Sequence, residues 1–198
     1  MNNTKIVGTT HITPKKLIIK EIEEFKPDII GVELCETRLK VMIEDIKPEL
    51  NMIEDTSLIG KIANAIKKKA NENNLDYGSD MISASKYALA NKIQLVCLDR
   101  DIMELRSLME KIPEKEALGF MTELGKFEEA NIKQEIDANK VLKELKEKYP
   151  VSFEFLINSR DLTIENNILK LILKNPDKRI LVFIGKGHLI KIQKDLDG

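Results

Sequence analysis

Four short apolar runs, separated by longer segments with helical patterning, constrain the fold of this chain more than any other feature. The runs are residues 5–8, 29–34, 94–98 and 180–184. Apolar runs of roughly four to eight residues are typical of strands that are covered on both faces of a sheet. One of the intervening segments opens at Pro14 and ends near Phe25, with its apolar residues at helical spacing. The alternation predicts an α/β fold with a central, mainly parallel sheet of about four strands flanked by helices.

The size of the chain fits one domain. Its 198 residues, 42% of them hydrophobic, are enough for a single core spanning residues 1–198. Residues 102–150 are rich in charged helix formers and predict a helical insertion, with breaks at Pro113 and Gly125. The charged helices of this insertion offer a surface for a homo-oligomer.

Two further segments are expected to be mainly helical. Residues 36–75 carry an apolar stripe, with a break at Pro48. Residues 153–173 predict a helix that is interrupted near residues 158–161.

Charge and cysteine content exclude several classes of protein. With 32 basic and 33 acidic residues the net charge is −1, which gives no reason to expect nucleic acid as a partner. Cys35 and Cys97 each lie in an apolar run and are interpreted as buried thiols, because a disulfide framework needs more cysteines. No signal peptide is apparent, and no apolar run approaches the roughly 20 residues of a membrane span. We therefore expect a cytoplasmic protein.

Polar side chains follow each of the four apolar runs. They are His11, residues 33–38, residues 99–101 and His188. Ligands of open α/β sheets gather at the carboxyl ends of the strands, so this edge is the predicted functional site. His11 and His188 are the only histidines, and each stands three positions after a glycine at which the backbone can turn sharply.

Glu33 is the first candidate site residue among the charged side chains. A carboxylate in an apolar strand is energetically costly unless it is paired with a cation or bound to a metal. It either pairs with an arginine such as Arg38 or Arg100, or joins His11 and His188 as a third ligand. Two imidazoles and a carboxylate suit a divalent Zn, Mn, Co or Fe ion with an open position for water. Two imidazole nitrogens that share one ion must lie within about 4 Å of each other.

The remaining candidates are four charged residues. Glu36 is either a catalytic base or a residue that begins a helix. Arg38, Arg100 and Arg160 either bind a substrate carboxylate and stabilise an oxyanion, or neutralise neighbouring acids.

In this order, these clusters resemble the TraB/PrgY family, which is related to the Tiki proteins and more distantly to the erythromycin esterase and ChaN-like group. The matching stretches are residues 7–11, 26–34 with Arg38, 78–81, 99–102, 160–161 and 185–189. The resemblance implies an α/β domain in which His11, His188, Glu33 and Arg38 share one site. Tiki proteins are regarded as metal-dependent proteases, and TraB/PrgY members are associated with limiting peptide pheromone activity. Cys35 stands where the family usually has an aspartate.

Three hypotheses result for the function, each with a peptide or a small molecule as the bound partner. The leading one is a metal-dependent hydrolase, in which metal-activated water cleaves a peptide bond. The second is a metal-independent hydrolase of the esterase type, in which a histidine beside a carboxylate activates water. The third is a protein that binds a peptide or haem without catalysis.

Overall fold

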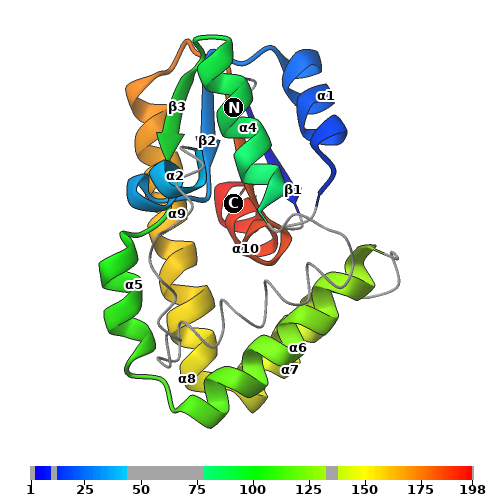
Figure 1. The fold of residues 1–198 in the computed structure, drawn as a ribbon, viewed down its shortest axis with the longest axis vertical. Coiled ribbons are helices and arrows are strands. Elements are labelled where there is room, and N and C mark those ends of the chain that lie inside the picture. The colour runs from blue at the N-terminus through cyan, green and yellow to red at the C-terminus, as the bar shows by residue number, and fades with distance from the viewer. Residues whose placement is uncertain (1–2, 10–12, 44–77, 133–137, 198) are drawn as a thin grey trace.

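The structure is a computed structural model that describes residues 3–9, 13–43, 78–132 and 138–197. Its strands are β1 (Thr4–Thr9), β2 (Ile29–Val32), β3 (Gln94–Cys97) and β4 (Ile180–Gly185). They form one sheet in the order β1-β4-β2-β3, and every pair of neighbours is parallel (Figure 1). Each strand falls on one of the four apolar runs, so the predicted α/β fold with a parallel sheet is confirmed.

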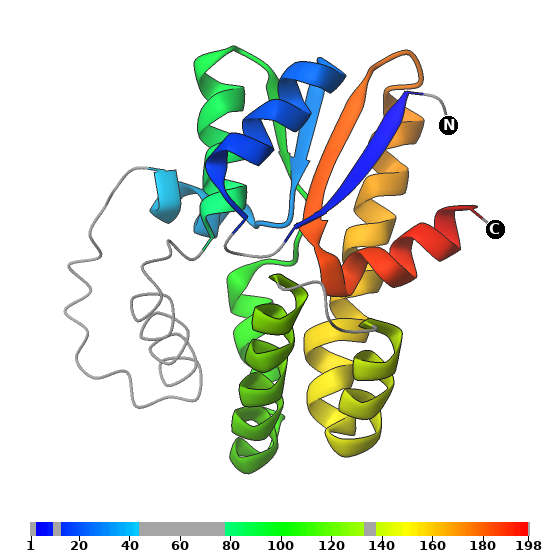
Figure 2. The same ribbon diagram turned by 90° about the vertical axis from the view of Figure 1, so that its right-hand side faces the viewer.

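Helices cover both faces of the sheet and its carboxyl end. They are α1 (Lys15–Phe25), α2 (Glu36–Ile43), α4 (Ser79–Ala90), α5 (Ile102–Met109), α6 (Glu114–Ile132), α7 (Ala138–Lys148), α8 (Pro150–Phe153), α9 (Ser159–Lys174) and α10 (Lys186–Asp197). Helices α1 and α4 pack on one face of the sheet, and α9 and α10 on the other (Figure 2). Beyond residue 43, the segment predicted to be helical over 36–75 lies outside the described residues.

Strand β4 shows why the apolar runs do not alternate with polar residues. Leu181 and Phe183 pack with α1 and α4, whereas Val182 and Ile184 pack with α9 and α10. Successive side chains of a strand point to opposite faces, and here both faces are covered. All four side chains are consequently fully buried.

A helical unit made of α5 to α8 lies below the carboxyl edge of the sheet (Figures 1 and 2). It has an apolar cluster of its own, in which Phe120 and Leu145 are buried deepest among the large side chains. The predicted break at Pro113 is confirmed, because α5 ends at Met109 and α6 begins at Glu114. The predicted break at Gly125 is wrong, since α6 continues through it to Ile132. No helix within the described ranges is long and apolar enough to cross a membrane.

The helix that ends in α9 contains one π-helical turn, Glu154–Asn158, which joins α8 to α9 without a break. The interruption predicted near residues 158–161 is therefore a change of helical pitch over Glu154–Asn158, which overlaps the predicted position at Asn158, and not an end of the helix. A π turn accommodates an extra residue within a helix and rotates the residues after it about the helix axis. Here the rotation precedes Arg160 and Asp161.

Candidate functional site

The register of the sheet brings the ends of the strands to one edge. Thr9 pairs with Gly185, and Val32 pairs with Phe183. The carboxyl ends of β1, β2 and β4 therefore lie side by side, above the helical unit (Figure 2). This edge holds most of the buried charged side chains of the described chain.

Glu33 directly follows β2, and its carboxylate is engaged on both oxygens. The Arg160 guanidinium lies 2.5 Å from Oε1, and Nε2 of His188 lies 3.3 Å from the same oxygen. The main-chain N–H of Gly185 donates to Oε2 at 2.6 Å. The arginine that pairs with Glu33 is thus Arg160, rather than Arg38 or Arg100. Only 3% of Glu33 is exposed, so these contacts replace the water that the carboxylate loses.

Arg160 also joins Glu33 to Asp99, which lies two residues beyond the end of β3. Its Nη2 lies 2.7 Å from Oδ2 of Asp99, and Arg38 reaches the same oxygen at 3.3 Å. Burial works against the guanidinium charge, but the carboxylates of Glu33 and Asp99 outweigh it and raise the pKa of Arg160 above its usual value. The guanidinium is therefore permanently charged and fixes the two carboxylates relative to each other.

His188 lies between two carboxylates. Its Nδ1 is 2.5 Å from Oδ1 of Asp161, and its Nε2 faces Glu33. Burial lowers the pKa of the imidazole, but the charge of Glu33 and the bond to Asp161 outweigh burial and raise the pKa to about 9. The imidazole therefore carries a proton on both nitrogens at neutral pH, as a cation that either carboxylate can stabilise. At the outer side of Asp161, the half-exposed Lys191 lies 3.9 Å away.

The π turn explains how two neighbouring residues of one helix both serve this site. Successive residues of an α-helix point about 100° apart, so Arg160 reaches Glu33 and Asp99 while Asp161 reaches His188. The π turn directly before Ser159 sets the rotation of α9 about its axis.

A further buried carboxylate, Asp80, stands at the start of α4. Thr9 donates its hydroxyl to Oδ2 at 2.5 Å, and the N–H of Met81 donates to Oδ1 at 2.7 Å. Asp80 is fully buried. It ties α4 to the end of β1, two residues before His11 in the chain.

The other predicted site residues lie at the margin of this network or outside it. Arg100 turns toward α9 and donates to the carbonyl of Ser159 and the hydroxyl of Thr163. Glu36 is exposed at the first position of α2. His11 lies outside the described residues. Asp101 caps α5 by accepting a hydrogen bond from the N–H of Met103.

The described side chains of this edge meet the requirements of a divalent metal only in part. Within the described ranges, no group of three or more His, Cys, Asp or Glu side chains is placed to hold an ion. The Nδ1 bond to Asp161 suits a ligating histidine, because such a partner orients the ring. Glu33 suits a ligand less well, because a guanidinium already lies 2.5 Å from its Oε1 and would repel a dication.

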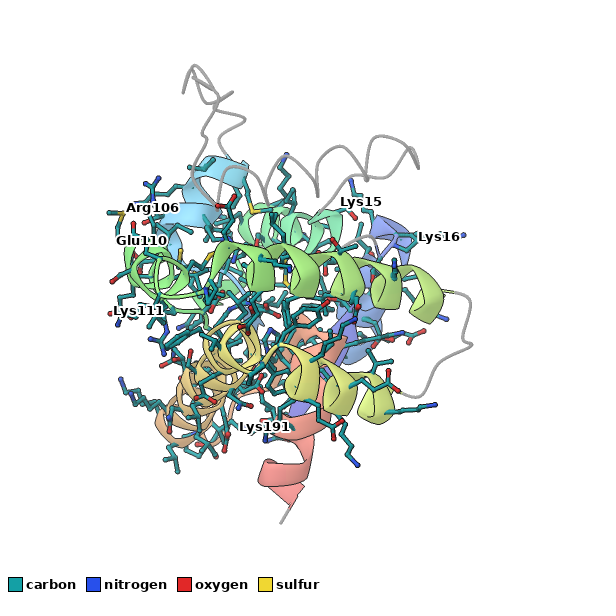
Figure 3. The ribbon with its side chains drawn as sticks, turned by 90° about the horizontal axis from the view of Figure 1, so that it is seen from below. Lys15, Lys16, Arg106, Glu110, Lys111 and Lys191 are labelled. Atoms are coloured by element: carbon teal, nitrogen blue, oxygen red, sulfur yellow. The ribbon has the colours of Figure 1, made fainter. Side chains whose placement is uncertain are left out.

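A groove of about 600 Å³ opens next to the network, between α2 and β3. Leu39, Leu95, Val96 and Cys97 form its apolar part, and Asp99 stands in its lining. The helical unit covers the carboxyl edge of the sheet from below. In this view α6 and α7 lie in front of the sheet edge, with Lys191 on the side of α10 and Arg106 on the side of α5 (Figure 3).

Two buried carboxylates of this edge, Asp161 and Asp80, were not predicted as site residues. A signal for each exists in the sequence, because both interrupt an apolar helical stripe. Asp161 stands between Ile157 and Ile164, and Asp80 stands four residues before Ala84. A carboxylate on the buried stripe of a helix needs a partner, and His188 and Thr9 are those partners.

A scan against models of known protein families gives no match for this chain, and a search of curated proteins also gives none.

Proposed function

We propose that this chain is a hydrolase whose reactive centre is His188 with its two carboxylates, Glu33 and Asp161. The observation that carries the proposal is the position of the imidazole: Asp161 holds Nδ1 at 2.5 Å, and Nε2 points at Glu33 at 3.3 Å. A ring held by a carboxylate at one nitrogen presents the other nitrogen in a fixed direction, as acid–base catalysis requires.

The charges at the site assign a role to each group. The imidazolium of His188 is a proton donor for a leaving group, because its pKa of about 9 keeps it protonated at neutral pH. Glu33 is the nearest acceptor for a proton from water. The contact between Glu33 and His188, at 3.3 Å, is longer than those of Glu33 with Arg160 and Gly185, so it is the one that a substrate displaces.

Arg160 supplies a fixed positive charge beside the reacting groups. Its guanidinium bridges Glu33 and Asp99, and a developing oxyanion near Glu33 would lie next to it. Arg38, which is about one-third exposed and lies 3.3 Å from Asp99, is more exposed than Arg160 and is therefore the arginine that would bind a substrate carboxylate.

A metal-dependent form of the same hydrolase is the second candidate. It is favoured by the pairing of Thr9 with Gly185, which starts the two histidine-bearing segments side by side. Two peptide units separate Thr9 from His11, and they span at most about 7 Å. His11, His188 and Glu33 would hold a Zn, Mn, Co or Fe ion, which would polarise a carbonyl and acidify bound water.

The test measures hydrolysis of p-nitrophenyl acetate and of fluorescently labelled casein by the purified full chain. We expect His188→Gln to lower kcat/KM by at least about 100-fold and Asp161→Asn by about 10-fold or more. Asp28→Asn is the matched control. The carboxylate of Asp28 accepts a hydrogen bond from the N–H of Arg179 at the amino end of the sheet, the end opposite to the site, so this variant should retain activity. The proposal fails if neither probe is cleaved, or if His188→Gln cleaves at the wild-type rate.

Removal of metal separates the two candidates. The protein is dialysed against EDTA and 1,10-phenanthroline, its metal content is measured by mass spectrometry, and hydrolysis is assayed again. Activity that survives without metal supports the histidine–carboxylate centre. Activity that is lost, and returns with one of the four ions at one ion per chain, supports the metal-dependent form. Binding of peptide or haem without turnover would instead support the non-catalytic hypothesis.

A further inference from the structure

We propose that the free edge of β3, with the groove beside it, binds an extended peptide that carries a basic side chain, as an added strand. The inference rests on the proposed hydrolase, for which it names the substrate class. It concerns how the substrate is held, so the experiment below measures binding of the peptide separately from its cleavage.

Strand β3 is at the end of the sheet order and pairs only with β2 among the described strands. The N–H of Leu98 donates to Val32, so the main-chain groups of Leu98 and Val96 face β2. By strand alternation the N–H and C=O groups of Leu95 and Cys97 face away from β2. An unpaired row of this kind is a template for another strand, and peptide recognition commonly uses it.

The groove lies along this edge and has room for side chains. Its apolar part is formed by Leu39 of α2 and by three residues of β3, within a volume of about 600 Å³. Burial, followed by the charge of Glu36, raises the pKa of Cys97 to about 11, so its thiol stays neutral and adds to the apolar surface. Alternate side chains of an extended peptide would enter this part, while its backbone pairs with β3.

The charges of the groove favour a basic side chain. Glu36, Asp99, Asp101 and Lys40 are its charged lining residues. Arg160 and Arg38 already neutralise the charge of Asp99. The exposed carboxylates of Glu36 and Asp101 then outnumber the single ammonium group of Lys40. The surplus is negative, and a lysine or arginine of the peptide complements it.

The groove also borders the network of the reactive centre. Asp99 stands in its lining and is bonded to Arg160, whose guanidinium also contacts Glu33. A peptide paired with β3 would thus run toward the carboxyl edge of the sheet, where Asp99 joins the groove to that network. A main-chain ladder fixes the direction and register of the bound chain, which suits a peptide better than a rounded small molecule.

The experiment measures fluorescence anisotropy of labelled octapeptides on the His188→Gln variant, so that bound peptide is not cleaved. The probes are four repeats of Val-Lys, four repeats of Val-Glu, and the Val-Lys peptide with every second amide N-methylated. We expect the Val-Lys peptide to bind about tenfold more tightly than the Val-Glu peptide. Methylation removes the N–H donors along one edge of the extended peptide. The methylated probe should therefore bind at least tenfold more weakly if that edge of the peptide faces β3. A second probe, methylated at the other amides, tests the opposite edge of the peptide.

Leu95→Pro and Leu95→Ala form the matched pair of protein variants, each made in the His188→Gln background. Both remove the leucine side chain, but only proline removes the outward N–H, and edge strands tolerate proline at such positions. Binding should be at least tenfold weaker in the proline variant than in the alanine variant. The double variant Glu36→Gln with Asp101→Asn keeps the α5 cap, because asparagine also caps helices, and should reduce the preference for the Val-Lys peptide to about twofold.

Several outcomes overturn the inference. It is wrong if no probe binds, if neither of the two methylated probes binds more weakly than the unmethylated peptide, or if the alanine and proline variants bind alike while both keep the far-ultraviolet circular dichroism of the parent. It is also wrong if the parent elutes as a dimer that only Leu95→Pro dissociates, since β3 would then pair with a second copy. Binding with no cleavage by the His188-containing chain refutes the hydrolase and keeps the groove. Cleavage of casein that is indifferent to Leu95→Pro keeps the hydrolase and refutes the groove.

Discussion

The bond network around His188 makes the stability of the protein depend on pH in a specific direction. In the folded protein the pKa of the imidazole is raised from 6.5 to about 9. Between these values the native state binds the proton and the unfolded chain does not, so stability falls as pH rises. The full contribution is present below about pH 6.5 and is lost once the pH passes 9. At 1.36 kcal/mol per pKa unit, the loss is about 3 kcal/mol.

The assay is urea unfolding of the chelated protein at intervals from pH 6 to pH 9.5, for the wild type and for His188→Gln. Cys97 contributes to both proteins, since its folded pKa of about 11 exceeds the value of 9.0 for a free thiol. The difference between the two curves therefore isolates the imidazole. We expect the wild-type advantage to shrink by about 3 kcal/mol over this range. Ring signals of isotopically labelled histidine, assigned by the loss of one set in His188→Gln, give the pKa directly.

Two results would refute this reasoning. One is a pH dependence of unfolding that is the same in both proteins. The other is an assigned His188 ring that titrates near 6.5, which would mean that burial offsets the two carboxylates in the native protein.

Three further substitutions test the network and the backbone around it. Arg160→Met leaves the buried acids Glu33 and Asp99 without their shared cation, so it should lower the free energy of unfolding by about 3–5 kcal/mol. The double variant Arg160→Met with Glu33→Gln should recover part of this loss. Urea unfolding of the wild type, the single variant and the double variant measures both effects. Gly31→Ala places a methyl group 2.7 Å from the buried Leu98 side chain and should lower the free energy of unfolding by about 1–3 kcal/mol in the same urea measurement. An unchanged free energy of unfolding would mean that Leu98 moves aside without cost. Gly187→Ala meets no atom within 4 Å and lies in a helix, so thermal unfolding should show equal or higher stability, by up to about 1 kcal/mol; a clear loss would contradict the open geometry.

The strands were predictable because covered strands leave a strong local signal. Residues 95–98 and 180–184 are apolar at every position, and the structure places β3 and β4 on these two runs. Gly125 shows the opposite case. Glycine costs about 1 kcal/mol in a helix, and packing within the helical unit outweighs that cost, so no break occurs.

The edge at which the site lies was also predictable, but the partners within it were not. Glu33 and His188 were expected at this edge because each lies at the carboxyl end of an apolar run, and the structure brings them to 3.3 Å. Which arginine pairs with Glu33 depends on the rotation of α9, which a π turn sets. Nothing in the local pattern distinguishes that turn from a broken helix, so Arg160 could not be separated from Arg38 in advance.

The place of β4 has a consequence for how the chain is made. Of the described strands β4 is synthesised last, yet it lies between β1 and β2, and β1 has no other neighbour among these strands. While the ribosome is still adding residues before 180, β1 cannot be incorporated, and both halves of the core lack their central layer. Folding of the sheet must therefore wait until residues 180–185 have been added, and fragments that end before β4 should remain targets for chaperones and proteases.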